Sequence, residues 1–418
     1  MSDNLSQSGQ IDLADLTASA TTRMDLNGPL VAGRRLAATA RPLRILVAHD
    51  VARARNGGMS RLMGYIHDQV AARGVAIDYF CTDDRTTNAP SRIARLTFPL
   101  AVYRHARTAA RAGSPYDIIN VHEPAAAAVI AGRSLLGNPA MVVTTHGIER
   151  RGWHRTLEES RLGREPLALR TRMSYPLTTL WQANYSLRHA DHILCLNFED
   201  RDYLLEHYGR SLNDVTRIYP GAASVYAIGA RRRDYSRART ILFAGTWLAR
   251  KGTRDLSTAF ALALARNPAL RLCVLGSGAD PEIVRAAFPP ETHAAIHTTT
   301  AVGEERSAAA FGDADIYVLP SLFEGTPLTL IEAMASGLPI ITTATCGMRD
   351  VIRDNENGLL VPLRAPDAIA NAIQQLVDDR PLRERLGRAA AAEANRSYTW
   401  EHAALPVAEV YARLRPSA

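Results

Sequence analysis

Two glutamates, Glu324 and Glu332, lie in one short segment with seven residues between them. An apolar run at 316–319 precedes the pair, and a second run at 339–341 follows it. Short apolar runs predict buried strands, and the stretch between them is long enough for a loop and a helix. We therefore expect Glu324 in the loop after a strand and Glu332 inside the helix that follows.

The residues between the glutamates predict an anion site at the start of that helix. Thr326 suits the N-cap and Pro327 the first helical position. The free amides around Gly325, Thr326 and Leu328 would then favour a phosphate. Carboxylates repel phosphate but accept hydrogen bonds from hydroxyls, so this combination predicts a nucleotide-sugar site. The alternative is that both glutamates are solvated acids at helix ends.

Lys251 is the one lysine of the chain, against 48 arginines. It lies in the segment 243–252, which contains Gly245 and precedes a helix expected to begin near Thr253. Lysine is a compact point charge with movable donors, and one fixed donor to a developing anion is worth about 10²–10³ in rate. We expect Lys251 to neutralise a phosphate, with Arg250 as a second charge. The alternative is an ordinary surface lysine.

Two further loops supply site residues. Gly57 and Gly58 follow the first predicted strand, where glycine permits a close backbone approach to phosphate or acceptor, although ordinary turns also use such pairs. His146 follows an apolar run at 141–145 and is expected to project from the carboxyl end of a strand. A lone histidine is more often structural than catalytic, so both roles stay open for His146.

The elements that must position these residues alternate along the chain. At 418 residues, the chain is too long for one ordinary core. Alternating strands and helices predict the α/β class, with two Rossmann-like domains and a ligand in the crevice between them. Strands are expected at 43–48, 76–81, 117–121, 141–145, 192–196 and 215–218, and then at 240–244, 270–275, 294–297, 316–319, 340–343 and 359–361.

Taken together, the motifs resemble the retaining glycosyltransferases of the two-Rossmann, or GT-B, fold, and among them the bacterial family-4 group. The resemblance spans roughly residues 43–415 and includes Pro320-Ser321 before the glutamate pair and Gly337-Leu-Pro after it. It implies that Glu324 contacts the hydroxyls of the donor sugar and that Glu332 contacts the ribose. The last segment resembles the helix with which this family crosses back to its first domain.

The resemblance also implies that Lys251 neutralises the donor diphosphate and that His146 lies near the donor sugar. The family often has an arginine where this chain has Thr246. Arg250 is the nearest replacement for that missing charge. Asp313 and Asp315 could suggest a metal site, but they precede a strand and so lie at its amino end, away from the crevice.

The expected divisions follow from these patterns. A mobile tail at 1–41 precedes an acceptor-binding Rossmann-like domain at 42–222. A linker at 223–238 leads to a nucleotide-sugar-binding Rossmann-like domain at 239–397, and a helix at 398–418 returns to the first domain.

The expected activity is that of a retaining, metal-independent hexosyltransferase. It would move a sugar from a UDP- or GDP-linked donor to a saccharide or lipid-linked saccharide, as in the biosynthesis of exopolysaccharide or glycolipid. No cofactor beyond the donor is expected. The alternatives are a nucleotide-sugar epimerase or phosphorylase on the same fold, or a non-catalytic scaffold.

The net charge of +7 is unevenly distributed. Residues 1–238 hold 31 arginines against 22 acidic residues, whereas 239–418 hold 18 basic and 20 acidic residues. A basic N-terminal half suits anionic lipid or a polyanionic acceptor, and the segment Arg150-Arg151-Gly152-Trp153 is a candidate contact. The alternative is a dispersed arginine surface. No nucleic-acid-binding motif accompanies the charge, so nucleic acid is not expected.

Neither a membrane-spanning run nor a secretory signal is expected in this sequence. The four cysteines are far apart and beside apolar runs, which favours buried free thiols. We expect a cytoplasmic protein, with contact at the inner face of the cell membrane left open.

Overall fold

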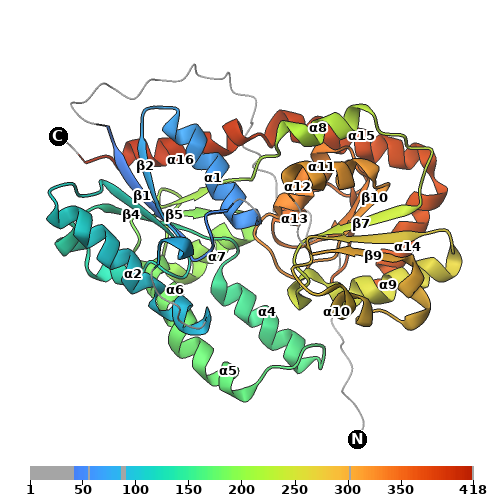
Figure 1. Cartoon of the computed structure of the whole chain (residues 1–418), viewed down its shortest axis with the longest axis horizontal. Coiled ribbons are helices and arrows are strands. Elements are labelled where there is room, and N and C mark those ends of the chain that lie inside the picture. The colour runs from blue at the N-terminus through green and yellow to red at the C-terminus, as the bar shows by residue number, and fades with distance from the viewer. Residues whose placement is uncertain (1–41, 55–56, 86–90, 301–302, 417–418) are drawn as a thin grey trace, which may run out of the picture. The chain divides into compact units, whose positions relative to one another are not determined.

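The computed structural model describes residues 42–54, 57–85, 91–300 and 303–416. The tail predicted at 1–41 lies outside the described residues. Residues 40–418 form one compact unit that contains two six-stranded parallel sheets. This architecture confirms the predicted α/β class (Figure 1).

The first sheet has the strand order β2-β1-β3-β4-β5-β6. Its strands are β1 (Arg44–Ala48), β2 (Ala76–Phe80), β3 (Ile118–His122), β4 (Ala140–Thr144), β5 (His192–Cys195) and β6 (Val215–Arg217). The order reverses between β1 and β3, which pair directly. The carboxyl ends of these two strands therefore flank the switch point, where ligands of such sheets bind.

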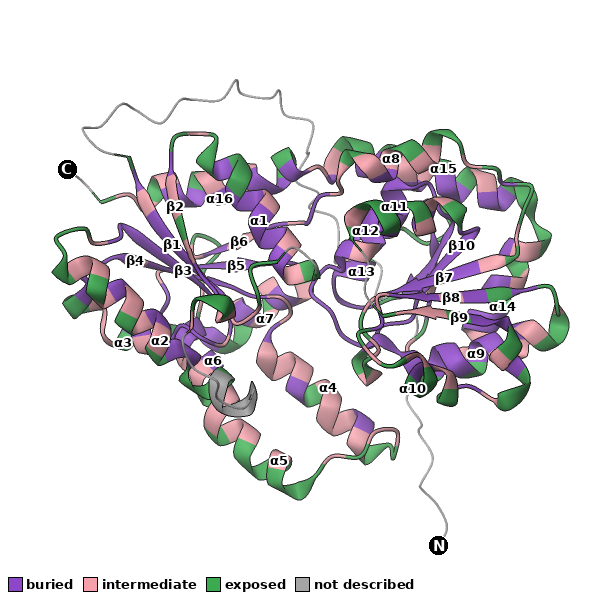
Figure 2. Cartoon of the chain, in the orientation of Figure 1, coloured by how far each residue is buried: buried purple, intermediate pink, exposed green. Residues whose placement is uncertain are grey.

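The helices of this half are α1 (Gly58–Ala71), α2 (Ser91–Arg111), α3 (Ala127–Ala131), α4 (Glu149–Arg161), α5 (Leu169–Tyr175), α6 (Trp181–His189) and α7 (Phe198–Tyr208). Parallel strands covered on both faces read as continuous apolar runs. The central strands of this sheet are almost wholly buried, as Figure 2 shows.

The second sheet has the order β12-β11-β10-β7-β8-β9. Its strands are β7 (Thr240–Ala244), β8 (Arg271–Leu275), β9 (Ile296–Thr299), β10 (Ile316–Leu319), β11 (Ile340–Thr343) and β12 (Leu359–Val361). Here the reversal lies between β7 and β10, which pair in parallel. The loops after β7 and β10 carry Lys251 and Glu324, so the topology brings these two residues to one place.

The remaining α-helices are α8 (Ser224–Arg231), α9 (Thr253–Arg266), α10 (Pro281–Ala286), α11 (Glu304–Asp313), α12 (Leu328–Ala335), α13 (Cys346–Val351), α14 (Pro366–Asp378), α15 (Arg380–Ser397) and α16 (Trp400–Arg413).

Asp315 accepts hydrogen bonds from the backbone amides of Arg239 and Thr240, at 2.8 and 2.9 Å. This acid therefore lies at the amino end of the sheet, as predicted.

All twelve predicted strands are present, with bounds that differ by no more than two residues. The segment predicted as a linker differs, because it contains helix α8. Tyr226 of α8 is only 1% exposed and packs edge-on against Phe311 of α11, at 5.4 Å between ring centroids. Helix α8 is therefore part of the second core, and the domain boundary remains a prediction.

Helix α16 packs against α1 of the first half, as the sequence predicts for a returning helix. The hydroxyl of Tyr411 lies 2.8 Å from His67 and accepts a hydrogen bond from Asn120 at 2.7 Å. All three side chains are buried, so the closing helix is anchored by a polar contact as well as by apolar packing.

All four cysteines are free thiols. Cys81, Cys195 and Cys346 are buried, as predicted. Cys273 on β8 is only partly buried and differs from that expectation. Within the described residues, no helix is long and apolar enough to cross a membrane.

Candidate active site

The loops that leave β7 and β10 meet in an ion cluster around Glu324. Lys251 Nζ lies 2.7 Å from one carboxylate oxygen of Glu324, and Arg250 Nη1 lies 3.2 Å from the other. Lys251 and Glu324 are each less than a tenth exposed, whereas the side chain of Arg250 is 46% exposed. The structure thus brings together three residues that the sequence assigns to one donor site.

Backbone geometry fixes the place of Lys251. It ends a short 3-10 turn, Ala249–Lys251, and Gly252 follows with a φ of +71°. A Cβ atom at Gly252 would fall on the carbonyl oxygen of Pro320. Glycine is therefore required there both for the left-handed conformation and for the contact between the two loops.

The charge state of Glu324 follows from its neighbours. Burial alone would raise its pKa, but the charges of Lys251 and Arg250 outweigh burial and hold the pKa below its ordinary value. Ser321 also donates a hydrogen bond to this carboxylate at 3.2 Å. Glu324 is thus an ionised acceptor, which suits sugar hydroxyls.

Helix α12 begins one residue later than predicted, with Pro327 as its N-cap. Thr326 does not cap it, because its hydroxyl donates instead to the backbone carbonyl of Leu196 in the first half. Thr326 and Leu328 are 6% and 7% exposed, so both residues are largely buried at this helix start. The N-cap prediction is wrong, although both residues do lie at the helix start.

Gly325 marks a close contact between the two halves. A Cβ atom there would lie 2.9 Å from a side-chain carbon of Leu196 and 3.0 Å from the backbone carbonyl of His146. Its own carbonyl accepts hydrogen bonds from Asn197, at 3.3 Å, and from the amide of Gly347, at 2.8 Å. The absence of a side chain at Gly325 lets the donor-side loop reach the loop that holds His146.

Glu332 on α12 is 1% exposed and pairs with Arg61 of α1, with 2.6 Å between Arg61 Nη1 and one carboxylate oxygen. The other oxygen, Oε2, is buried and has no hydrogen-bond partner among the described residues. Burial raises the pKa of Glu332 to about 7, since the attraction of Arg61 offsets only part of the desolvation. An unpartnered buried carboxylate oxygen is a ready acceptor for a ligand hydroxyl.

Arg61 was not assigned a role from the sequence. Arg61 lies three residues after Gly58. A Cβ atom added at Gly58 would lie 4.0 Å from Leu328, at the start of α12. The glycine pair Gly57-Gly58 stands at the start of α1 and is exposed. The predicted glycine loop and the predicted helix start therefore adjoin, and the only earlier signal for Arg61 was its proximity to that loop.

The phosphate segment after β7 contains Gly245 and Thr246. Gly245 places its backbone next to Lys251, since a Cβ atom there would lie 3.7 Å from Lys251 Nζ. Thr246 stands where the resemblance predicts an arginine, and it is exposed. Arg250 and Lys251 both reach Glu324 from this loop, so Arg250 supplies a second positive charge there.

His146 follows β4 by two residues, at the carboxyl end of the strand as predicted. Its Nε2 atom lies 2.5 Å from Nδ1 of His122, which ends β3, so one ring donates to the other. Burial, together with the nearby His49, lowers the pKa of His146 to about 3. At neutral pH the ring is uncharged.

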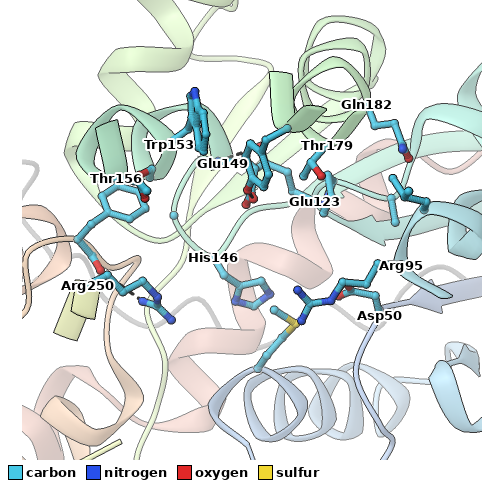
Figure 3. A pocket seen from close by; sticks show the side chains of 18 of the residues that line it. Asp50, Arg95, Glu123, His146, Glu149, Trp153, Thr156, Thr179, Gln182 and Arg250 are labelled. Carbon is cyan, nitrogen blue, oxygen red and sulfur yellow. Dashed lines mark hydrogen bonds and ion pairs between the residues drawn. The ribbon is translucent and has the colours of Figure 1, made fainter. Parts of the chain in front are cut away.

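A cavity of about 550 Å³ opens beside His146, and Arg250 of the ion cluster also lines it. Figure 3 shows its lining, which comes mainly from the first half, with Arg250 and Phe323 from the second. Its labelled residues are Asp50, Arg95, Glu123, His146, Glu149, Trp153, Thr156, Thr179, Gln182 and Arg250. Most of these residues were not predicted, because α4 to α6 carry no local motif.

Two glutamates, the buried Glu123 and the partly buried Glu149, give the cavity its polar character. Glu123 accepts a hydrogen bond from the amide of Glu149 at 3.1 Å, and its other oxygen has no partner among the described residues. Glu149 accepts a hydrogen bond from the hydroxyl of Tyr175. Burial raises the pKa of both carboxyls, that of Glu123 well above its ordinary value. In the sequence, His122 and Glu123 directly follow the strand expected at 117–121, where a structural or an acceptor-binding role is open.

The predicted anionic contact at Arg150-Arg151 does not hold for Arg151. Its guanidinium pairs with Glu199 and with the fully buried Asp200 of α7. It also lies over the ring of Phe323, 5.6 Å from the centroid. Arg151 therefore ties α4 to α7, while Trp153 stacks on Tyr175 at the cavity wall.

The two Rossmann-like sheets define a two-domain α/β fold of the GT-B type, and comparisons with known proteins agree. Residues 56–223 match the family model described as Glycosyltransferase Family 4, and residues 230–393 match Glycosyl transferases group 1. The chain belongs to the family-4 type of GT-B glycosyltransferases.

Among curated proteins, the chain is similar to D-inositol 3-phosphate glycosyltransferases. It is 31% identical to that of Streptomyces avermitilis over an alignment of 240 residues. This alignment covers 53% of this chain and 52% of the relative. It is 37% identical over 180 residues to that of Streptomyces griseus, which covers 41% of this chain and 38% of the relative. The chain thus spans about half the length of these relatives.

Among solved structures, sucrose-phosphate synthase from Thermosynechococcus elongatus superposes with a TM-score of 0.71 at 20% identity, over 89% of this chain and 99% of that one. Anabaena Alr3699/HepE in complex with UDP and glucose gives 0.61 at 14% identity, over 89% and 100%. At this identity, the likeness shows the fold alone.

Proposed function

We propose that the protein is a retaining glycosyltransferase that moves a hexosyl group from a nucleotide diphosphate sugar to a hydroxyl acceptor. The observation that carries this proposal is the cluster of Glu324, Lys251 and Arg250 at the point where the strand order of the second sheet reverses. An ionised carboxylate held between two cations, beside a second buried carboxylate, suits a ligand with both hydroxyls and phosphates.

In the proposed donor complex, Lys251 and Arg250 neutralise the diphosphate and Glu324 orients the sugar. The unpartnered oxygen of Glu332 accepts a hydroxyl of the ribose. The donor is UDP- or GDP-linked, and the UDP bound in the structural neighbour from Anabaena supports UDP. Lys251 Nζ lies 2.7 Å from Glu324, so in the proposed complex the diphosphate shares or displaces that ion pair.

In the proposed reaction, the acceptor hydroxyl attacks on the same face from which the diphosphate leaves. The departing phosphate oxygen takes the acceptor proton, so the bond from the sugar to phosphate breaks as the bond to the acceptor forms. No second carboxylate nucleophile is required. Two fixed cations at the leaving group can supply the charge stabilisation, so we propose a reaction without a metal or further cofactor.

The cavity beside His146 is the proposed acceptor site. Its free carboxylate oxygen on Glu123, together with Glu149 and Gln182, suits a hydroxyl-rich acceptor. The curated relatives are named for a cyclic polyol phosphate, and the two acids of the cavity, Glu123 and Glu149, favour the polyol part of such a ligand over its phosphate. An acceptor cavity also favours transfer over epimerisation, which needs no acceptor. We place the reaction in cytoplasmic polysaccharide or glycolipid biosynthesis.

The test is donor turnover by variants of the ion cluster. We expect Lys251→Ala to lower the rate of UDP-sugar consumption by about 10²–10³, because it removes a fixed donor to the leaving diphosphate. Arg266→Ala removes an exposed positive charge from α9 and serves as the matched control. Unchanged turnover in both Lys251→Ala and Glu332→Ala would show that the assignment is wrong.

A further inference from the structure

Residues 167–190 contain one helical run, 169–189, that carries an exposed apolar stripe. The run consists of α5, a π-helical turn at Pro176–Leu180, and α6. Four large apolar side chains recur at every fourth residue and are more than half exposed: Leu169 at 70%, Met173 at 65%, Leu177 at 80% and Trp181 at 58%. Single exposed apolar residues are common, but four on successive turns of one run mark an interaction surface.

The other sides of the run are already occupied. Leu180, Ala183 and Leu187 are buried against the first half. Thr171, Tyr175, Thr179 and Gln182 line the cavity beside His146. The exposed stripe is offset from these cavity residues by about half a helical turn, so it faces away from the cavity. Figure 2 shows α5 coloured mainly as exposed and intermediate.

The charge of the run identifies what would cover the stripe. The sequence from Leu167 to Ala190 contains three arginines and no aspartate or glutamate. Arg170, Arg172 and Arg188 are all exposed. An apolar stripe on a helical run that carries arginines and no acidic residue is the pattern of a helix that lies in the interface of an anionic bilayer. A protein partner or a second copy of the chain would not require that the run lack acidic residues.

The geometry points to an in-plane membrane contact made by residues 167–190. In it, Leu169, Met173, Leu177 and Trp181 enter the boundary between headgroups and acyl chains, and the arginines contact anionic headgroups. This inference deepens the proposed function, on which it rests for the role of the cavity. The helix then lies between the bilayer and the cavity, which places the acceptor site roughly 10 Å, one helix diameter, from the lipid. That distance suits an acceptor carried by a membrane lipid.

Sedimentation with lipid vesicles tests the contact. The full chain is expected to bind vesicles of phosphatidylcholine with roughly a third phosphatidylglycerol, and to bind pure phosphatidylcholine much more weakly. The double variant Leu177→Ser/Trp181→Ser should bind the anionic vesicles at least about tenfold more weakly, since it removes two inserted side chains. Ile283→Ser, which removes a 63% exposed apolar residue from the second half, is the matched control and should bind as wild type does.

UDP-sugar hydrolysis in the absence of vesicles separates this inference from the proposed function. Hydrolysis that is retained in the double variant shows that the fold and donor site are intact. The membrane contact is overturned if wild type does not bind anionic vesicles, or if the double variant binds as well as wild type. It is also overturned if wild type forms a dimer that this variant dissociates, because a second copy would then cover the stripe. If wild type binds anionic vesicles but does not hydrolyse UDP-sugar, the proposed function is overturned and the membrane contact is not.

Discussion

At the scale of single residues, both predicted glutamates are paired with cations, but in different ways. Glu324 is held by two cations of its own half, and its pKa is lowered. Glu332 is held by Arg61 of the other half, and burial raises its pKa to about 7. The two carboxyls therefore differ in charge near neutral pH: Glu324 is ionised, whereas Glu332, with a pKa of about 7, is close to its titration point. Arg61 also joins the proposed ribose site to the glycine loop, so it couples donor binding to the contact between the halves.

We predict that Arg61→Ala destabilises the fold by about 3–5 kcal/mol, because it leaves Glu332 as a buried carboxylate without its cation. The double variant Arg61→Ala/Glu332→Gln should recover much of this loss, since no charge is then buried alone. Urea unfolding of wild type and of the two variants measures the loss and the recovery in the free energy of unfolding. A double variant as unstable as Arg61→Ala would contradict the buried ion pair.

At the scale of elements, the strands followed from the sequence because each is a short apolar run in a sheet covered on both faces. The ion cluster also followed, because β7 and β10 are neighbours at the reversal of strand order. Helix α8 was not predicted, since Gly229 and the arginines after it are typical of a linker. Its apolar face becomes evident only from its packing on α11. Thr326 does not act as the predicted N-cap, because its hydroxyl donates to the carbonyl of Leu196, which is distant in the sequence.

The loop contact at Gly252 gives a prediction at this scale. Gly252→Ala should lower both stability and donor turnover, because the new methyl group collides with Pro320 and shifts Lys251. Gly163→Ala is the matched control, since Gly163 has a similar φ of +64° but no atom within 4 Å of the place its new methyl group would take. Thermal unfolding and UDP-sugar consumption are the readouts. Equal effects of the two substitutions would show that backbone strain alone, and not the loop contact, matters.

At the scale of the whole described chain, ion pairs join the two halves away from the donor site. Arg164 contacts Glu159 of α4 at 2.8 Å and Asp255 of α9 at 2.7 Å. Arg364 reaches Glu159 at 2.6 Å from the second half. These pairs connect α4, which lines the acceptor cavity, to the half that holds the proposed donor site. They support a closed arrangement, which would exclude water from the reacting sugar.

We therefore predict that Arg164→Ala raises the fraction of donor lost to hydrolysis severalfold relative to transfer, because it weakens closure without touching the ion cluster. Arg161→Ala, at the exposed last position of α4, should leave that fraction unchanged. Product analysis by chromatography distinguishes free sugar from transferred sugar. An unchanged ratio in Arg164→Ala would mean that this bridge does not control closure.

The central claim is that the donor lies across Lys251, Glu324 and Glu332. The most direct measurement is a crystal structure of the full chain with a UDP-sugar bound. We predict diphosphate oxygens beside Lys251 and Arg250, and a ribose hydroxyl within hydrogen-bond distance of Glu332. A nucleotide sugar bound elsewhere, with the pair of Arg61 and Glu332 and the cluster around Glu324 untouched, would contradict it.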